Sequence, residues 1–190
     1  MSFTVVYDAN VLYPESLRDL LVRMGQTHLV RARWTEQIMN EWSRALVKRR
    51  PDLETRIQGT VRLMNESFRS ALVTGYKALI PHLTLPDPDD RHVLAAAIRS
   101  GAQAIVTFNL AHFPEQELKP YRLKALHPDE LIAGLMGQGL VSIVQEMASE
   151  KQRPPVTPLE VVASLRWAGL RRSADLLIAR LRATSGSPPR

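Results

Sequence analysis

The chain has 190 residues, of which 45% are hydrophobic and 23% are charged, as in globular rather than disordered proteins. It contains no cysteine, which excludes a disulfide framework, a cysteine-ligated zinc or iron–sulfur site and a thiol nucleophile. The 25 basic and 19 acidic side chains give a net charge of +6, and a positive field favours polyanions such as RNA or DNA as partners.

The first third of the chain alternates predicted strands and helices. Short apolar runs over residues 3–7 and 28–30 predict two strands. Apolar residues recur every three or four positions in three other segments, which predicts amphipathic helices over residues 17–24, 35–50 and 53–72.

The beginning of the chain lacks the basic segment and the long apolar stretch of a signal peptide. No apolar run approaches the roughly 18 residues that a membrane-spanning helix needs. We therefore expect a cytoplasmic protein that does not bind a membrane.

The middle third continues the alternation. Residues 83–85, 104–108 and 123–126 predict three more short strands, and a run of helix formers over residues 91–100 ends at Gly101, where a left-handed cap often closes a helix. Strand–helix–strand connections of these lengths are typical of a parallel sheet covered by helices. We therefore expect a three-layer α/β/α domain with a central parallel sheet.

Strand signals end near residue 128, and Thr157 and Glu160 have the spacing of a capping box at the start of a helix. We expect one α/β domain over residues 1–135 and a small all-α extension over residues 136–190. Helices are predicted within 129–136, 141–151, 158–168 and 173–183.

The extension carries too many apolar residues for a solvated tail. Its helices should therefore cover the α/β domain, a second copy or a partner protein. Arginines such as Arg171 and Arg172 would remain outside and could contact RNA. A stabilising cover and an RNA-binding role both stay open.

Polar side chains follow two predicted strands. Asp8 comes directly after the first strand, and Thr107 and Asn109 come at the end of a later one. In open α/β sheets, ligands gather at the edge where strands end and helices begin. Glu41 lies at the border of the apolar stripe of its predicted helix. Taken singly, Asp8 and Asn109 have a simpler explanation as turn residues, and Glu41 as a solvated helix charge.

Three aspartates, Asp87, Asp89 and Asp90, crowd the start of the helix predicted over residues 91–100. Aspartate is a favoured N-cap residue and interacts well with the helix dipole. One cap needs only one aspartate, however, and three carboxylates within four positions repel each other. A cation should therefore offset them.

These oxygen ligands converge on one edge of the predicted sheet. An all-oxygen set suits a hard divalent ion, Mg²⁺ or Mn²⁺, and such ions accelerate the hydrolysis of phosphodiesters. A basic protein with an acidic centre is the arrangement that we expect for a metal-dependent nuclease.

Four segments resemble the PIN-domain nucleases, and in particular the VapC-like toxins of bacterial toxin–antitoxin systems. They are Asp-Ala-Asn-Val-Leu at 8–12, Ile-Met-Asn-Glu-Trp at 38–42, Asp-Pro-Asp-Asp-Arg-His-Val-Leu-Ala-Ala-Ala at 87–97 and Ile-Val-Thr-Phe-Asn at 105–109. The resemblance covers roughly residues 1–135, and it rests on the order and spacing of the four motifs.

The resemblance implies a Mg²⁺- or Mn²⁺-dependent endoribonuclease, the toxin of a type II system, with Asp8, Glu41 and Asp90 as metal ligands. The fourth motif usually ends in an acid, and Asn109 stands there in this chain. Its amide oxygen can still ligate a metal or orient a water molecule. Asn10 and Thr107 are further candidates for orienting water or a ligand.

The resemblance also implies an RNA substrate and a cognate antitoxin, and it is compatible with a homodimer. Direct attack by water, without use of the 2′-hydroxyl, would leave 5′-phosphate and 3′-hydroxyl ends. The candidates for contact with the RNA backbone are Arg31, Arg33, Arg91, Lys48, Arg49 and Arg50.

Two alternatives stay open: a catalytically impaired module that binds RNA or an antitoxin, with Asn109 as the sign of decay, and an interaction protein whose acidic pocket receives an arginine from a partner. The five histidines show no metal-ligand spacing. His92, two residues after Asp90, is expected to point away from the site.

Overall fold

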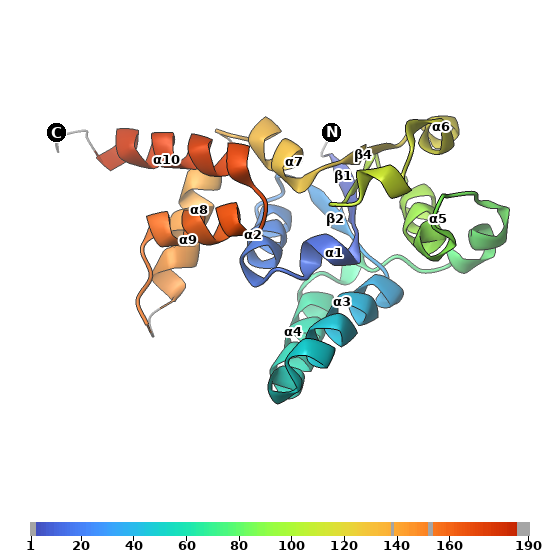
Figure 1. Cartoon of the computed structure of the whole chain (residues 1–190), viewed down its shortest axis with the longest axis horizontal. Helices are drawn as coiled ribbons and strands as arrows, with labels where there is room; N and C mark the ends of the chain where they lie inside the picture. Colours follow the sequence, from blue (N-terminus) through green and yellow to red (C-terminus); the bar gives the residue numbers. More distant parts are fainter. Residues whose placement is uncertain (1–2, 138, 152–153, 186–190) are drawn as a thin grey trace. The chain divides into compact units, whose positions relative to one another are not determined.

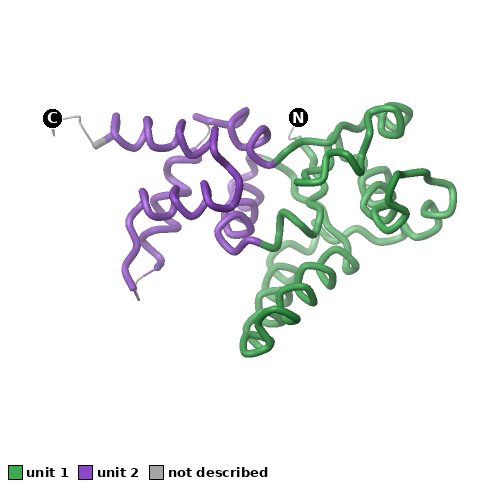
Figure 2. Tube along the Cα trace, in the orientation of Figure 1, with its two compact units in different colours: residues 1–13, 30–127 green, residues 14–29, 128–190 purple. Residues whose placement is uncertain are grey.

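A computed structural model gives the structure of the chain and describes residues 3–137, 139–151 and 154–185 (Figure 1). The chain forms two compact units (Figure 2). Unit 1 comprises residues 1–13 and 30–127, and unit 2 comprises residues 14–29 and 128–190.

The centre of unit 1 is a four-stranded parallel sheet in the order β2-β1-β3-β4. Its strands are β1 (Thr4–Tyr7), β2 (Arg31–Arg33), β3 (Ala104–Val106) and β4 (Lys124–Leu126). Every residue of β1 and β3 is buried, as expected for the middle strands of a parallel sheet with two covered faces. All four carboxyl ends therefore lie along one edge of the sheet.

The helices of unit 1 are α1 (Ala9–Leu12), α3 (Glu36–Arg49), α4 (Glu54–Ser67), α5 (Arg91–Ser100) and α6 (Glu115–Leu118). Helix α5 packs against β1, β2 and β3 through a face of buried apolar residues. Helix α3 packs against α1 and α4. These contacts bring the starts of α1 and α5, together with one face of α3, toward the sheet.

Several 3₁₀ turns connect these elements. Two of them, Pro88–Asp90 and Leu110–His112, lie at the acidic residues Asp87 and Asp90. The turns are Pro51–Leu53, Arg69–Ala71, Lys77–His82, Pro88–Asp90, Leu110–His112 and Lys119–Tyr121.

In the part of the chain that the structure describes, helices are the main elements of unit 2. It contains α2 (Glu15–Gln26), α7 (Pro128–Gly134), α8 (Leu140–Glu150), α9 (Pro158–Trp167) and α10 (Arg171–Ser185). Helix α2 packs against α8 and α9, and α10 packs against α7, α8 and α9. Among the described residues, no helix is both long and apolar enough to cross a membrane.

The expected fold class, a PIN-like parallel α/β/α arrangement followed by an all-helical C-terminal part, is confirmed. The capping box is also present, because Thr157 Oγ1 accepts from Glu160 N at 3.2 Å while Glu160 Oε2 accepts from Thr157 N at 2.7 Å. Gly101 closes α5 with φ of 62°.

Three predictions of local structure were wrong. Residues 28–30 are not a strand, because His28 N and Leu29 N bind carbonyls at the end of α2, and the strand begins only at Arg31. Residues 83–85 form no strand, although Leu83 and Leu85 are both buried. The helix expected over residues 53–72 stops at Ser67 and gives way to a 3₁₀ turn.

The domain boundary near residue 135 remains a prediction. The compact units place α2, which lies early in the chain, with the C-terminal helices. Part of the apolar surface that those helices carry is therefore covered by α2, through its contacts with α8 and α9.

The start of α10 is capped by a side chain from α7. The Asp129 carboxylate accepts from Arg172 N at 2.9 Å and from Ser173 N at 2.7 Å, and Ser173 Oγ donates to the Asp129 carbonyl at 3.0 Å. We expect Asp129→Ala to lower the free energy of unfolding by about 1–2 kcal/mol, because two helix N–H groups lose their acceptor. Thermal unfolding measures the loss; Glu130→Ala, at an exposed neighbour, is the control, and equal losses in both variants would contradict the capping role.

Candidate active site

Asp8 is held at the carboxyl end of the central strand β1. Its backbone is extended, with φ of −73° and ψ of 155°, and its side chain caps α1. Asp8 N donates to the Val106 carbonyl of β3 at 3.1 Å, which continues the sheet by one bond. The residue is only 5% exposed, so its carboxylate lies in a largely desolvated position.

Asn10 and Thr107 bind the Asp8 carboxylate directly. Asp8 Oδ2 accepts from Asn10 Nδ2 at 2.7 Å and from Thr107 Oγ1 at 2.6 Å, while Oδ1 accepts from Ala9 N at 2.6 Å. Asn10 Oδ1 accepts from Phe108 N at 3.1 Å. The residues predicted to orient water or a ligand therefore first orient Asp8.

Asn109 lies beside this network without joining it through its side chain. Its backbone N–H donates to Thr107 Oγ1 at 3.0 Å, and the residue is exposed at the start of the Leu110–His112 turn. Among the described residues, its amide group has no hydrogen-bond partner. The amide is therefore free to bind a ligand or a water molecule.

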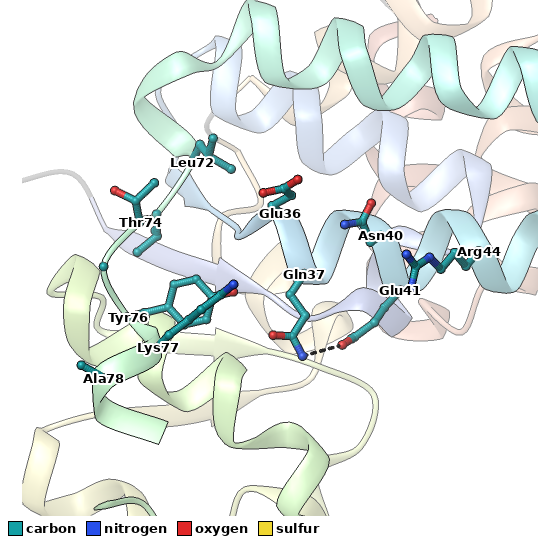
Figure 3. Close-up of a pocket in the computed structure, with 12 residues that line it drawn as sticks. Glu36, Gln37, Asn40, Glu41, Arg44, Leu72, Thr74, Tyr76, Lys77 and Ala78 are labelled. Atoms are coloured by element: carbon teal, nitrogen blue, oxygen red, sulfur yellow. Dashed lines mark hydrogen bonds between the residues drawn. The ribbon is translucent and has the colours of Figure 1, made fainter. Parts of the chain in front are cut away.

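Glu41 is positioned on α3 by two side chains. Its Oε1 lies 2.9 Å from Nε2 of His92. The same oxygen accepts from Gln37 Nε2 at 3.3 Å (Figure 3). His92 is 3% exposed and belongs to α5, so this contact joins the two helices. The expectation that His92 points away from the site was wrong.

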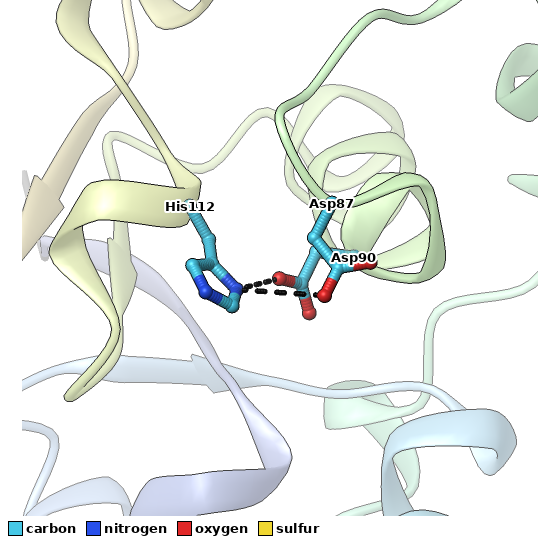
Figure 4. Close-up of side chains that lie close together, drawn as sticks. All are labelled: Asp87, Asp90 and His112. Atoms are coloured by element: carbon cyan, nitrogen blue, oxygen red, sulfur yellow. Dashed lines mark hydrogen bonds and ion pairs between the residues drawn. The ribbon is translucent and has the colours of Figure 1, made fainter.

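Asp90 pairs with a histidine from the turn after β3. His112 Nδ1 lies 2.6 Å from Asp90 Oδ2 and 3.8 Å from Asp87 Oδ2 (Figure 4). Asp87 also accepts from Asp89 N at 2.9 Å, and this bond caps the turn before α5. The His112 imidazole therefore lies against two of the three crowded aspartates.

The electrostatics of Asp8 reflect its burial and its acidic neighbours. Burial raises the pKa of the Asp8 carboxyl, and the negative charges of Asp90 and Glu41 raise it further. Hydrogen bonds from Thr107 and from Ala9 N oppose this rise. The three predicted metal ligands therefore interact electrostatically, and the ionised Asp8 carboxylate is held at a cost that a nearby cation would offset.

The donor atoms suit a divalent cation. An ionised carboxylate offers about four lone-pair sites, and the three hydrogen bonds to Asp8 leave one of them on Oδ1. Among the described residues, the group whose ligand atoms all lie within 4.8 Å of one another is Asp87, Asp90 and His112. Asp90 is the predicted ligand that belongs to this group; Asp8 and Glu41 lie outside it, and His112 adds a ring nitrogen to the expected oxygen ligands.

The predicted RNA-contacting arginines lie at different distances from this edge. Arg31 pairs with Thr4 at the far end of β1. Thr4 lies about 13 Å from Asp8 along the strand, because a strand rises about 3.3 Å per residue. Arg33 pairs with Val6, nearer the edge, and burial followed by the charge of Arg31 lowers its pKa. Arg91 is half-buried at the start of α5, and its Nε has no hydrogen-bond partner among the described atoms.

Sequence reasoning missed His92 and His112 as members of the site. For His112 a signal was available: it ends the turn that Asn109 begins, so the strand-end argument that selected Asn109 applies to it as well. For His92 the signal was its place on the buried face of α5, where an imidazole needs a polar partner.

Comparison with known proteins places the chain in a family. Residues 138–179 match the VapC50 C-terminal domain. A protein described as "Putative ribonuclease VapC50", from Mycobacterium tuberculosis (strain ATCC 25618 / H37Rv), is 40% identical over 99 residues, which are 50% of this chain and 58% of that protein. The match therefore spans less than two thirds of that relative. No solved structure is a significant match to the chain. Residues 4–111, more than half of the chain, match the PIN domain, and the chain belongs to the PIN-domain family.

Proposed function

We propose that this protein is a metal-dependent endoribonuclease, the toxin of a type II toxin–antitoxin system, which hydrolyses RNA phosphodiester bonds. Membership of the PIN-domain family and the ribonuclease name of the relative support this proposal. The net charge of +6 favours a polyanionic substrate.

The observation that carries the proposal is the burial of Asp8 beside other acids. Asp8 is only 5% exposed, and Asp90 and Glu41 add negative potential there. A site that only bound RNA would gain nothing from this arrangement, because carboxylates repel phosphate. A divalent cation reverses the sign of the local potential and makes the site attractive to phosphate.

We assign Asp8, Glu41 and Asp90 as the residues that would hold Mg²⁺ or Mn²⁺, with Asp87 and His112 beside Asp90. When bound, the ion would neutralise the phosphate and lower the pKa of bound water. Asn10 and Thr107 fix the Asp8 carboxylate.

The side chains around these acids have supporting roles in the proposal. His92 and Gln37 fix the Glu41 carboxylate. The free amide of Asn109 would orient the attacking water or an oxygen of the phosphate.

A cleavage assay on labelled single-stranded RNA tests the proposed activity. The full chain with Mn²⁺ or Mg²⁺ should cut the RNA internally and leave 5′-phosphate and 3′-hydroxyl ends, since water attacks directly. EDTA should stop cleavage without unfolding the chain, as followed by circular dichroism. Cleavage that persists in EDTA, or products with 2′,3′-cyclic phosphate ends, would contradict the proposal.

On acidification, we expect metal binding to weaken at a higher pH than it would if the ligands were exposed aspartates. Protons compete with the metal for Asp8, whose pKa is raised above its ordinary value of 3.8 by burial and by neighbouring acids. Because the folded-state pKa is raised, the stability that Asp8 contributes is present below its unfolded pKa and is lost as pH rises through the folded pKa.

A metal ion restores stability on the alkaline side, so its effect on Tm should be largest above the folded pKa and should shrink below it. Thermal unfolding with and without Mn²⁺ across the pH range measures this difference. A metal-induced rise in Tm that stays constant down to the pH at which exposed aspartates become protonated would contradict the assignment of Asp8.

Asn109→Asp tests the neutral residue that ends the fourth motif. If the amide only lowers the negative charge of the site, the substitution should tighten Mn²⁺ binding, by about 10-fold on the scale of changes near metal ligands, and should maintain or raise cleavage. If the amide holds substrate or a partner, cleavage should fall although the metal binds more tightly. Titration calorimetry beside the cleavage assay separates these results, and no change in either would make Asn109 a turn residue only.

The alternative function is a catalytically impaired module that binds RNA or an antitoxin. It is favoured by the neutral Asn109 and by the imidazoles that pair with Glu41 and Asp90. Under either function we propose a cognate antitoxin as the protein partner and a homodimer as the assembly. RNA binding without metal-dependent cleavage would support this alternative.

A further inference from the structure

A pocket in unit 1 lies beside Glu41 and extends well beyond the proposed metal ligands. Its volume is about 760 Å³, within the roughly 300–1,000 Å³ typical of small-molecule sites. Residues of α3 line one side and the segment 72–78 lines the other (Figure 3). A metal ion with its water molecules needs far less room, so the pocket has space for a larger chemical group.

The two walls are joined by backbone hydrogen bonds. Trp34 N, just before α3, donates to the Ala71 carbonyl at 3.0 Å, and Val73 N donates to the Trp34 carbonyl at 2.8 Å. Gly75 turns the opposite wall with φ of 71°, and a Cβ at this position would lie 3.4 Å from Arg99 Nε. The pocket is therefore preformed in the folded chain.

The lining offers polar groups that no other part of the described chain uses. Among the described residues, the side chains of Asn40, Arg44, Thr74 and Lys77 make no hydrogen bond or ion pair. Leu72, 37% exposed, adds an apolar surface to the lining. The combination of a free amide, free cations and an apolar wall suits a flat heterocycle attached to an anion.

We propose that this pocket binds an unpaired base of the RNA substrate, next to the phosphate at the proposed metal site; this inference rests on the proposed function. Single-stranded RNA is read by bases that leave the stack and form hydrogen bonds with side chains. The Asn40 amide supplies a donor and an acceptor for the edge of the base, and Leu72 contacts its face. Arg44 and Lys77 bind the flanking phosphates.

The observations favour RNA over a peptide as the occupant. Among the described residues, Arg44 and Lys77 make no ion pair with the two acids of the lining, Glu36 and Glu41, so a segment of a protein partner would have to supply an acid for each cation. An RNA strand supplies a phosphate at every nucleotide. Glu41 lies on the same pocket wall, so a strand that places one phosphate at the metal ligands carries its adjoining base into the pocket.

RNA binding by the full chain, measured with Mn²⁺ present and with RNAs whose phosphates carry non-bridging sulfur to slow hydrolysis, tests this inference. The probes are short single-stranded RNAs that differ in one base, followed by fluorescence anisotropy. Asn40→Ala should reduce discrimination between the bases by roughly 5- to 100-fold, because a base-edge contact is lost. Lys77→Ala should weaken binding of all probes alike and lower the salt dependence by about one phosphate contact.

Two control variants lie away from the pocket. Gln58→Ala removes an exposed amide on α4, and Lys119→Ala removes an exposed cation beside α6; both should bind RNA as the wild type does. If Asn40→Ala keeps the base preference and Lys77→Ala keeps the affinity, the inference is overturned, as it would be for a pocket that takes a peptide. If the wild-type chain binds none of the probes, the proposed function itself fails and the inference falls with it.

Discussion

Asp8→Asn is expected to stop RNA cleavage and to remove the stabilisation of the fold by metal. The substitution keeps the shape of the side chain but removes its charge, and it replaces one acceptor oxygen by an NH₂ group. If the bound cation contributes about 3 kcal/mol to the transition state, its loss lowers the cleavage rate by roughly 100-fold or more. The wild-type rise in Tm with Mn²⁺ should be nearly absent in the variant.

The metal-free fold should change little, because two effects oppose each other. Asparagine loses hydrogen bonds that the Asp8 carboxylate accepts from Asn10 and Thr107, but the cost of burying a negative charge also disappears. Circular dichroism and thermal unfolding without metal check this point. The outcome therefore separates a loss of metal from a loss of structure.

Asp89→Asn is the matched control for this experiment. Asp89 is exposed and belongs to the same acidic turn, but it lies outside the group formed by Asp87, Asp90 and His112. It should keep both cleavage and the metal-induced rise in Tm. Equal losses in Asp8→Asn and Asp89→Asn would mean that the general negative charge of this edge, rather than a specific carboxylate, carries the effect.

The features that could be predicted from the sequence are those fixed by neighbouring residues. Asp8 at the end of β1, Gly101 at the end of α5 and the capping box at Thr157 depend on backbone geometry within a few residues. The parallel sheet followed from the spacing of apolar runs. In each case the local pattern and the tertiary fold require the same conformation.

The features that could not be predicted depend on contacts between distant segments. His92 is separated by 51 positions from Glu41, as their numbers give, and only the folded chain brings these residues of α5 and α3 into contact. His112 reaches Asp90 because the turn after β3 folds back toward the start of α5. No spacing rule for metal ligands covers such pairs, so the acid that each histidine contacts became visible only in the folded chain.

The strand errors have a similar cause. Leu83 and Leu85 alternate like a strand and are both buried, yet neighbouring 3₁₀ turns carry the chain past the sheet without joining it. Alternation reports burial on one face; it does not report whether a strand edge is available for pairing. The grouping of α2 with the C-terminal helices is likewise a matter of packing partners, which the helical period alone does not specify.

Leu165→Ala should destabilise unit 2 strongly, whereas the same substitution at Leu159 should have little effect. Both residues belong to α9, but Leu165 is 1% exposed and Leu159 is 50% exposed. Removing a fully buried leucine side chain costs about 2–5 kcal/mol, from lost apolar transfer and from the cavity that remains. A surface substitution usually changes stability by no more than about 0.5 kcal/mol.

The comparison isolates burial, because both substitutions replace leucine by alanine in one helix and so change helix propensity equally. The expected loss at Leu165 is a large part of the roughly 5–15 kcal/mol that stabilises a typical domain. Thermal and urea unfolding of both variants, with dye binding to report exposed apolar surface, measures the difference. Because α9 packs against α2, α8 and α10, a Leu165→Ala variant as stable as Leu159→Ala would mean that these helices do not form the common core described for unit 2.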